Sequence, residues 1–145
     1  MIVLDTNVLV YAVGADHRLR DPCRRIVGAI RDGAIDASTT VEVIQEFVHV
    51  RARRVGRRRA VRDGGDFTNL LTPLLVADAD DLARGLALFE RHEGLDCFDA
   101  VLAAATLGRE TEGLATADAG FDGIRGLRRF DPAGPELATM LASRR

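Results

Sequence analysis

The chain has 145 residues, 47% of them hydrophobic, and a net charge of −2, which predicts one domain over residues 1–145 with a sizeable core. No apolar run reaches the roughly 18 residues of a membrane span and no secretory signal pattern is present, so we expect a cytoplasmic protein that contacts no membrane. All twenty basic residues are arginines, which excludes any mechanism that needs a lysine.

Hydrophobic spacing and turn residues predict short strands that alternate with helices. In chain order we expect strand 2–4, helix 7–13, helix 21–32, strand 34–37, helix 41–54, helix 57–71, strand 74–76, helix 78–92, helix 96–107, strand 113–116, strand 128–130 and helix 135–142. Thr6 or Asn7 is the expected cap of the first helix, and Asp21-Pro22 is typical of a helix start. The alternation predicts an α/β fold in which helices cover both faces of a parallel sheet.

Acidic residues recur at the places where such a sheet binds ligands. Asp5 and Asp118 follow two predicted strands, and two predicted helices carry acids near their starts, Glu42 with Glu46 and Asp96 with Asp99. Because ligands bind at the carboxyl ends of parallel strands, we expect these carboxylates to share one crevice. Carboxylates this close repel one another unless a cation joins them, and all-oxygen sites suit Mg²⁺ or Mn²⁺. Such a site can activate water for phosphoryl displacement.

Each of these acids also has a structural interpretation. Asp96 can cap its helix, with Asp99 as a favourable first-turn acid. Glu42 fits a solvated helix start, and Asp118 and Asp122 fit turns. Spacing alone does not choose between Glu42 and Glu46 or between Asp96 and Asp99.

Four segments together resemble the PIN-domain ribonucleases, and among them the VapC-type toxins of toxin–antitoxin pairs. They are Val3–Leu9 with its Asp-Thr-Asn centre, the stretch from Thr40 to Glu46-Phe47, Asp99-Ala100 with the alanines that follow, and Thr116-Ala117-Asp118-Ala119-Gly120-Phe121. Their order and spacing match the family over almost the whole chain. The resemblance implies a three-layer α/β/α sandwich with a central parallel sheet.

The resemblance also implies a Mg²⁺- or Mn²⁺-dependent endoribonuclease. It assigns catalysis to Asp5, Glu46, Asp99 and Asp118, with Asp5, Asp99 and Asp118 as the metal ligands. Thr6 and Thr116 would be supporting hydroxyls, and Asp96 and Asp122 supporting acids. A VapC-type toxin further implies an RNA substrate, a cognate antitoxin that blocks the acidic site, and a homodimer.

A run of arginines follows the Glu46 segment. It comprises Arg51, Arg53, Arg54, Arg57, Arg58, Arg59 and Arg62. One interpretation is a rim that binds RNA phosphates near the acidic crevice, made by Arg51, Arg53, Arg54, Arg57, Arg58 and Arg59. The alternatives are a solvated helix face or a contact with an acidic partner.

Two other functional classes were weighed against the nuclease. A phosphatase of the haloacid dehalogenase type would need an Asp two residues after Asp5, where Asn7 stands, and a receiver domain would need a lysine. A module that binds RNA or a partner without cleavage stays open, although the complete set of acids argues against it.

Overall fold

The structure, a computed structural model, describes residues 1–143 as an α/β fold. Its elements are β1 (Ile2–Leu4), α1 (Thr6–Val13), α2 (Arg20–Arg31), β2 (Ala37–Ser38), α3 (Val41–Val55), α4 (Arg57–Leu71), α5 (Ala79–Arg91), α6 (Cys97–Leu107), β3 (Gly113–Ala115), the short 3₁₀ helix η1 (Ala119–Phe121), β4 (Arg129–Phe130) and α7 (Pro135–Ser143). The predicted alternation of strands and helices is therefore confirmed, and most boundaries agree within two residues.

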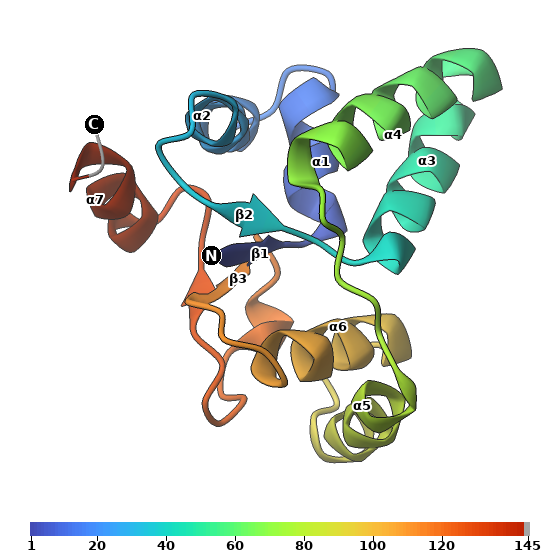
Figure 1. Cartoon of the computed structure of the whole chain (residues 1–145), viewed down its shortest axis with the longest axis vertical. Helices are drawn as coiled ribbons and strands as arrows, with labels where there is room; N and C mark the ends of the chain where they lie inside the picture. Colours follow the sequence, from blue (N-terminus) through green and yellow to red (C-terminus); the bar gives the residue numbers. More distant parts are fainter. Residues whose placement is uncertain (144–145) are drawn as a thin grey trace.

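The four strands form one parallel sheet in the order β2-β1-β3-β4. Helices α1 to α4 lie on one side of the sheet in Figure 1, and α5 and α6 lie on the other, which gives the expected three layers. β1 occupies the interior of the sheet and all three of its residues are fully buried, as its unbroken apolar sequence predicts. None of the helices in residues 1–143 is long and apolar enough to cross a membrane.

Helix starts show how short polar side chains set the boundaries. Asp5 itself caps α1, because its carboxylate accepts the Thr6 N–H at 2.6 Å, so the expected cap at Thr6 or Asn7 was wrong by one residue or more. Thr40 caps α3 by accepting the Val43 N–H at 3.3 Å. Asp96 caps α6 by accepting the Asp99 N–H at 2.8 Å, which confirms the cap interpretation of Asp96.

Three predicted elements differ from the structure. The strand expected at 34–37 lies instead at Ala37–Ser38, because the N–H groups of Ala34 and Ile35 bind the Ala29 carbonyl at the end of α2. Residues 74–76 do not form a strand, since only Leu75 pairs with the sheet, through an isolated parallel bridge to Thr40. Pairing stops there because Thr40 already caps α3. Helix α2 begins at Arg20 rather than after Asp21, and Pro22 is accommodated in its first turn, where backbone N–H groups have no intrahelical acceptor.

Helices α3 and α4 form a tight hairpin that projects from the sheet (Figure 1). Phe47 and Phe67 pack edge to face across it, with ring centroids 5.1 Å apart. A Cβ atom at Gly64 would overlap with the Val48 side chain, so this glycine permits the close approach of the two helices. Gly64 lowers the helix propensity of α4 but allows closer packing against α3. Helix α4 continues through the Gly64-Gly65 pair without a break.

Candidate active site

The sheet and two helices bring the predicted acids to one cavity. Asp5 directly follows β1, and its N–H donates to the Ala115 carbonyl at the end of β3, at 3.0 Å. This contact aligns the carboxyl ends of the two strands, and Asp118 follows β3 at the same edge. Helix α3 contributes Glu46, and α6 contributes Asp99. All four carboxylates line a cavity of about 280 Å³.

Asp5 is the most enclosed of the four acids, with only 5% of its surface exposed. Besides the Thr6 N–H, its carboxylate accepts the Thr116 hydroxyl at 2.6 Å and the Asn7 side-chain amide at 2.5 Å. Three donors therefore fix the position and orientation of this carboxylate.

Asn7 connects the two strand ends, a role that the sequence did not reveal. Its Nδ2 also donates to Thr116 Oγ1 at 2.9 Å, and its Oδ1 accepts the Ala117 N–H at 3.1 Å. An amide is the side chain suited to this position, because it offers donors to one neighbour and an acceptor to another. The only nearby sign of this connecting role in the sequence was that Asn7 stands two residues after Asp5.

The two predicted supporting hydroxyls contact the acid group directly. Thr6 Oγ1 donates to Glu46 at 2.6 Å, and this contact joins the start of α1 to the middle of α3. Thr116, besides donating to Asp5, accepts the Asp118 N–H at 3.0 Å. The Asp118 carboxylate accepts the Gly120 N–H at 2.7 Å in the following turn.

The two predicted supporting acids lie in different places. Asp96 lines the cavity while it caps α6. Asp122 is not among the cavity residues and accepts a hydrogen bond from Arg129 at 2.6 Å. Arg129 also donates to the Thr116 carbonyl at 3.2 Å, so Asp122 is connected to the site only through this arginine.

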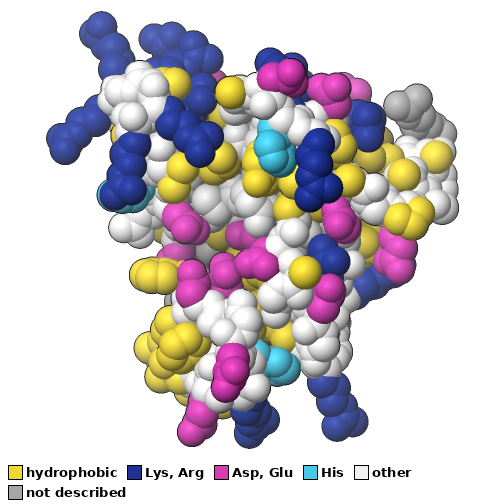
Figure 2. Space-filling model, turned by 180° about the vertical axis from the view of Figure 1, so that it is seen from behind, with side chains coloured by type: hydrophobic (Ala, Val, Ile, Leu, Met, Phe, Trp, Pro, Cys, Tyr) yellow, Lys and Arg dark blue, Asp and Glu magenta, His cyan; other side chains and the backbone are white. Residues whose placement is uncertain are grey.

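The arginine run divides into three groups. Arg51 and Arg59 bind the buried carboxylate of Asp63 on α4, at 2.8 and 2.7 Å. Arg51 thereby joins α3 to α4, whereas Arg59 pairs with Asp63 within α4. Arg54 alone lines the acidic cavity. The remaining members, Arg53, Arg57, Arg58 and Arg62, are exposed. Figure 2 shows arginine side chains gathered over one corner of the molecule, above a group of acidic side chains.

Burial and mutual repulsion raise the pKa values of two of the four acids. Burial raises the pKa of Asp5 to about 6 against the hydrogen bonds that lower it, and the charges of Glu46 and Asp118 add to the rise. Burial also raises the pKa of Asp99 to about 7, with contributions from the charges of Asp5, Asp96 and Asp118. These carboxylates are therefore crowded with negative charge that a cation would neutralise.

The donor set fits a hard divalent cation in its chemistry. Every candidate ligand is a carboxylate oxygen, which suits Mg²⁺ or Mn²⁺, and Mg²⁺ usually takes one or two carboxylates and keeps several waters. Within residues 1–143 no three acidic, histidine or cysteine side chains are already grouped as an ion site. The carboxylates would therefore have to draw together around an ion, and Asp5 would keep its place through its three donors.

Comparison with known proteins identifies the family of the chain. The sequence model of the PIN domain matches residues 2–127. The chain belongs to the PIN-domain family. It is 45% identical to ribonuclease VapC7 of Mycobacterium tuberculosis (strain H37Rv), covering 99% of this chain and 100% of that protein. It is 32% identical to ribonuclease VapC23 of the same species (strain CDC 1551), covering 81% of this chain and 93% of that protein. This PIN domain is therefore of the VapC type.

A solved structure supports the fold. The crystal structure of FitAcB from Neisseria gonorrhoeae superposes on this PIN domain with a TM-score of 0.68, over 91% of this chain and 98% of that one. The sequence identity is 21%, so the comparison bears on the α/β/α architecture alone.

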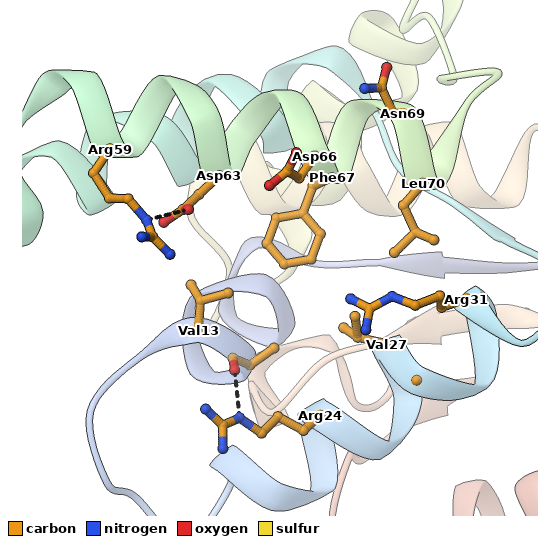
Figure 3. Close-up of a pocket in the computed structure, with 12 residues that line it drawn as sticks. Val13, Arg24, Val27, Arg31, Arg59, Asp63, Asp66, Phe67, Asn69 and Leu70 are labelled. Carbon is orange, nitrogen blue, oxygen red and sulfur yellow. Dashed lines mark hydrogen bonds and ion pairs between the residues drawn. The ribbon is translucent and has the colours of Figure 1, made fainter.

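A second and larger cavity, of about 790 Å³, lies between α1, α2 and α4 of this PIN domain. Figure 3 shows Val13, Val27 and Phe67 around it, with Arg24 and Arg31 on α2 and the Arg59–Asp63 ion pair on α4. None of the four candidate catalytic acids lines it. Its lining combines apolar side chains with three arginines and two aspartates, and Arg59 is already paired with Asp63. This mixed lining suits a protein segment better than it suits a metal ion.

The raised carboxyl pKa values predict that the metal-free protein loses stability as the pH rises. Between about pH 4 and pH 7 the folded state holds protons on Asp5 and Asp99 that the unfolded chain has released, so the free energy of unfolding falls across this range. The Asp5 shift alone corresponds to roughly 3 kcal/mol. Urea unfolding with chelator at pH 5 and pH 7.5 measures the loss, and Asp99→Asn should reduce it. An equal loss in Asp99→Asn would contradict the prediction.

Proposed function

We propose that residues 1–145 form a single PIN nuclease domain that hydrolyses RNA phosphodiester bonds with Mg²⁺ or Mn²⁺ and acts as the toxin of a toxin–antitoxin pair in the cytoplasm. One observation carries the proposal. Four carboxylates from four separate elements line one cavity, and hydroxyl and amide side chains hold two of them in place. The names of the VapC relatives, which describe ribonucleases, support the same activity.

The residues divide the chemistry among them. Asp5, Asp99 and Asp118 would hold the ion, which when bound supplies Lewis acidity that activates water and stabilises charge on the phosphate. Glu46 has one oxygen engaged by Thr6 Oγ1, and its other oxygen can orient the attacking water. The oxygen of that water bonds to phosphorus while the bond from phosphorus to the leaving oxygen, on the opposite side, breaks. The three donors around Asp5 keep the carboxylates aligned during this displacement.

Removing the metal tests the proposal directly. Purified protein incubated with RNA should cleave it in Mg²⁺ or Mn²⁺ and should stop when a chelator is added, because the acids alone repel the phosphate. Restoring Mg²⁺ after the chelator should restore cleavage, which controls for damage by the chelator. Cleavage at full rate in chelator would exclude the proposed mechanism. Tight RNA binding without cleavage under any condition would favour the alternative, a non-catalytic RNA- or partner-binding module on the same scaffold.

We propose that the arginines of the run that do not bind Asp63 bind RNA phosphates, with Arg54 nearest to the reacting centre. Arg54 lines the acidic cavity and forms no ion pair with any residue of the described range 1–143. Arg54→Gln should weaken RNA binding and reduce its salt dependence by about one unit of slope. Arg53→Gln, which removes the same charge from the neighbouring exposed position, should have a smaller effect. Equal effects of the two variants in a salt titration would show that only the total charge matters.

An antitoxin is the protein partner we propose, because a VapC-type nuclease with a complete acid set must be restrained in the cell that makes it. Blocking the acidic cavity would suffice for this. The larger cavity beside α4 offers a nearby surface of apolar and cationic side chains for such a protein. We also propose that the chain forms a homodimer, on the resemblance to the VapC family alone.

A further inference from the structure

The acidic cavity has one wall that the proposed hydrolysis does not use. Helix α1 contributes Val10 and Tyr11 to the cavity, which Asp96 and Asp99 at the start of α6 also line. Tyr11 is half-buried, and part of its surface packs against the hydrophobic core. The cavity thus combines carboxylates suited to a metal-bound phosphate with an aromatic side chain at the same opening.

Tyr11 is held rigidly in this position. Its ring stacks on the ring of His17, with centroids 4.5 Å apart and an angle of 13° between the planes. His17 is exposed, yet its own orientation is fixed, because its Nδ1 accepts the Leu19 N–H at 3.2 Å. An aromatic pair ordered before the ligand arrives loses little conformational entropy on binding.

We propose that Tyr11, supported by His17, is the platform on which an unpaired RNA base beside the scissile phosphate stacks. Every base has a π face, so such a platform tolerates different sequences while it requires that the base be free of a duplex. The inference rests on the proposed nuclease activity and adds to it a residue that binds the base beside the cut. Tyr11 acts as a binding residue here and takes no part in proton transfer.

The geometry favours a base over a protein side chain as the occupant of this wall. The neighbouring cavity residues are acids, together with Arg54, and this combination suits a nucleotide held through metal and phosphate. A protein segment of apolar character has a larger and less acidic cavity available between α1, α2 and α4. The competing explanation, which the test must distinguish from base stacking, is therefore that a protein docks on Tyr11.

The test removes the base from the RNA and the ring from the protein. A short single-stranded RNA that the protein cleaves is mapped for its cut position, and matched RNAs are made with an abasic residue on either side of the cut. Tyr11→Leu keeps an apolar side chain against the core and should lower kcat/KM about 10-fold on the intact RNA. On the RNA that lacks the stacked base, the same variant should cleave as well as the wild type does. Tyr11→Phe should behave as the wild type on both.

Two controls separate stacking from a fold defect. His17→Ala removes the exposed support and should give a smaller loss, again only on the intact RNA. Phe89→Ala changes another exposed aromatic, on α5 and outside the cavity, and should have no effect. If Tyr11→Leu lowers cleavage of intact and abasic RNA by the same factor, or lowers neither, the proposal that a base stacks on Tyr11 is wrong, whereas the proposed nuclease activity is unaffected. If the wild type cleaves no RNA in Mg²⁺ or Mn²⁺, both proposals fail.

Discussion

Replacing Asp5 with Asn is expected to lower metal-dependent RNA cleavage by at least about 100-fold while the protein remains folded. The change removes the negative charge from the most enclosed carboxylate and leaves Asp99 and Asp118 with one fewer partner for the ion. Folding should survive because Asn is as good a helix cap as Asp, and because a neutral side chain avoids the cost of burying a charge, which outweighs the loss of an acceptor for one side of the donor set around Asp5. Cleavage rate and urea unfolding of the same preparation measure the two expectations.

Asp36→Asn is the matched control for that variant. Asp36 is exposed and lies at the opposite end of β1, where its carbonyl accepts the Ile2 N–H. The same substitution there should change the cleavage rate by less than about twofold, since surface substitutions away from special features have small effects. If Asp5→Asn retained most of the activity, or if both variants lost it equally, the proposed role of Asp5 in ion binding would be untenable.

Asp81→Asn should cause the largest loss of stability from a single conservative change outside the active site. Asp81 on α5 is only 1% exposed and accepts hydrogen bonds from Arg84 at 2.7 Å and Arg109 at 2.9 Å. Burial acts to raise its pKa, but the hydrogen bonds from the two arginines outweigh burial and hold the pKa below its usual range. We expect a loss of roughly 3 kcal/mol, because the variant leaves two guanidinium groups without their counter-charge.

The measurement for Asp81 is urea unfolding at pH 7, with Asp80→Asn as control. Asp80 lies in the same helical turn but is exposed, and its variant should change the unfolding free energy by less than about half a kcal/mol. The lowered pKa means that the ion pairs contribute above about pH 4 and are lost as Asp81 is protonated below it. The difference between wild type and Asp81→Asn should therefore shrink in acid. A difference that stayed constant would assign the effect to packing.

Folded Asp81→Asn protein should cleave RNA at nearly the normal rate. Asp81 joins α5 to the end of α6 through Arg109, whereas the acids of α6 lie at its beginning. A loss of activity in excess of the loss of folded protein would show that the ion pairs of Asp81 also position Asp96 and Asp99.

Local sequence patterns predicted most of the elements, because the type of an element depends on nearby residues, whereas the choice of Glu46 over Glu42 and of Asp99 over Asp96 came from the resemblance to the PIN-domain family. The apolar run before Asp5 and the spacing of the helices specify a parallel sheet, whose geometry gathers strand ends at one edge. The contacts among polar side chains were less accessible. Nothing near Asn7 in the sequence points to Thr116 and Ala117, and nothing near Arg51 and Arg59 points to a buried Asp63 rather than to solvent or RNA.

The central place of β1 has a consequence for how the protein is made. β1 leaves the ribosome before β3, but it pairs with β3, and Asp5 receives the Thr116 hydroxyl from 111 positions further along the chain. Pairing over such a separation forms late, because loop closure must precede it. A nascent chain that has not yet reached residue 118 lacks one of the four acids and the donor that orients Asp5. The growing polypeptide therefore emerges beside ribosomal and messenger RNA with its acid group unassembled until residues 116 and 118 have been synthesised.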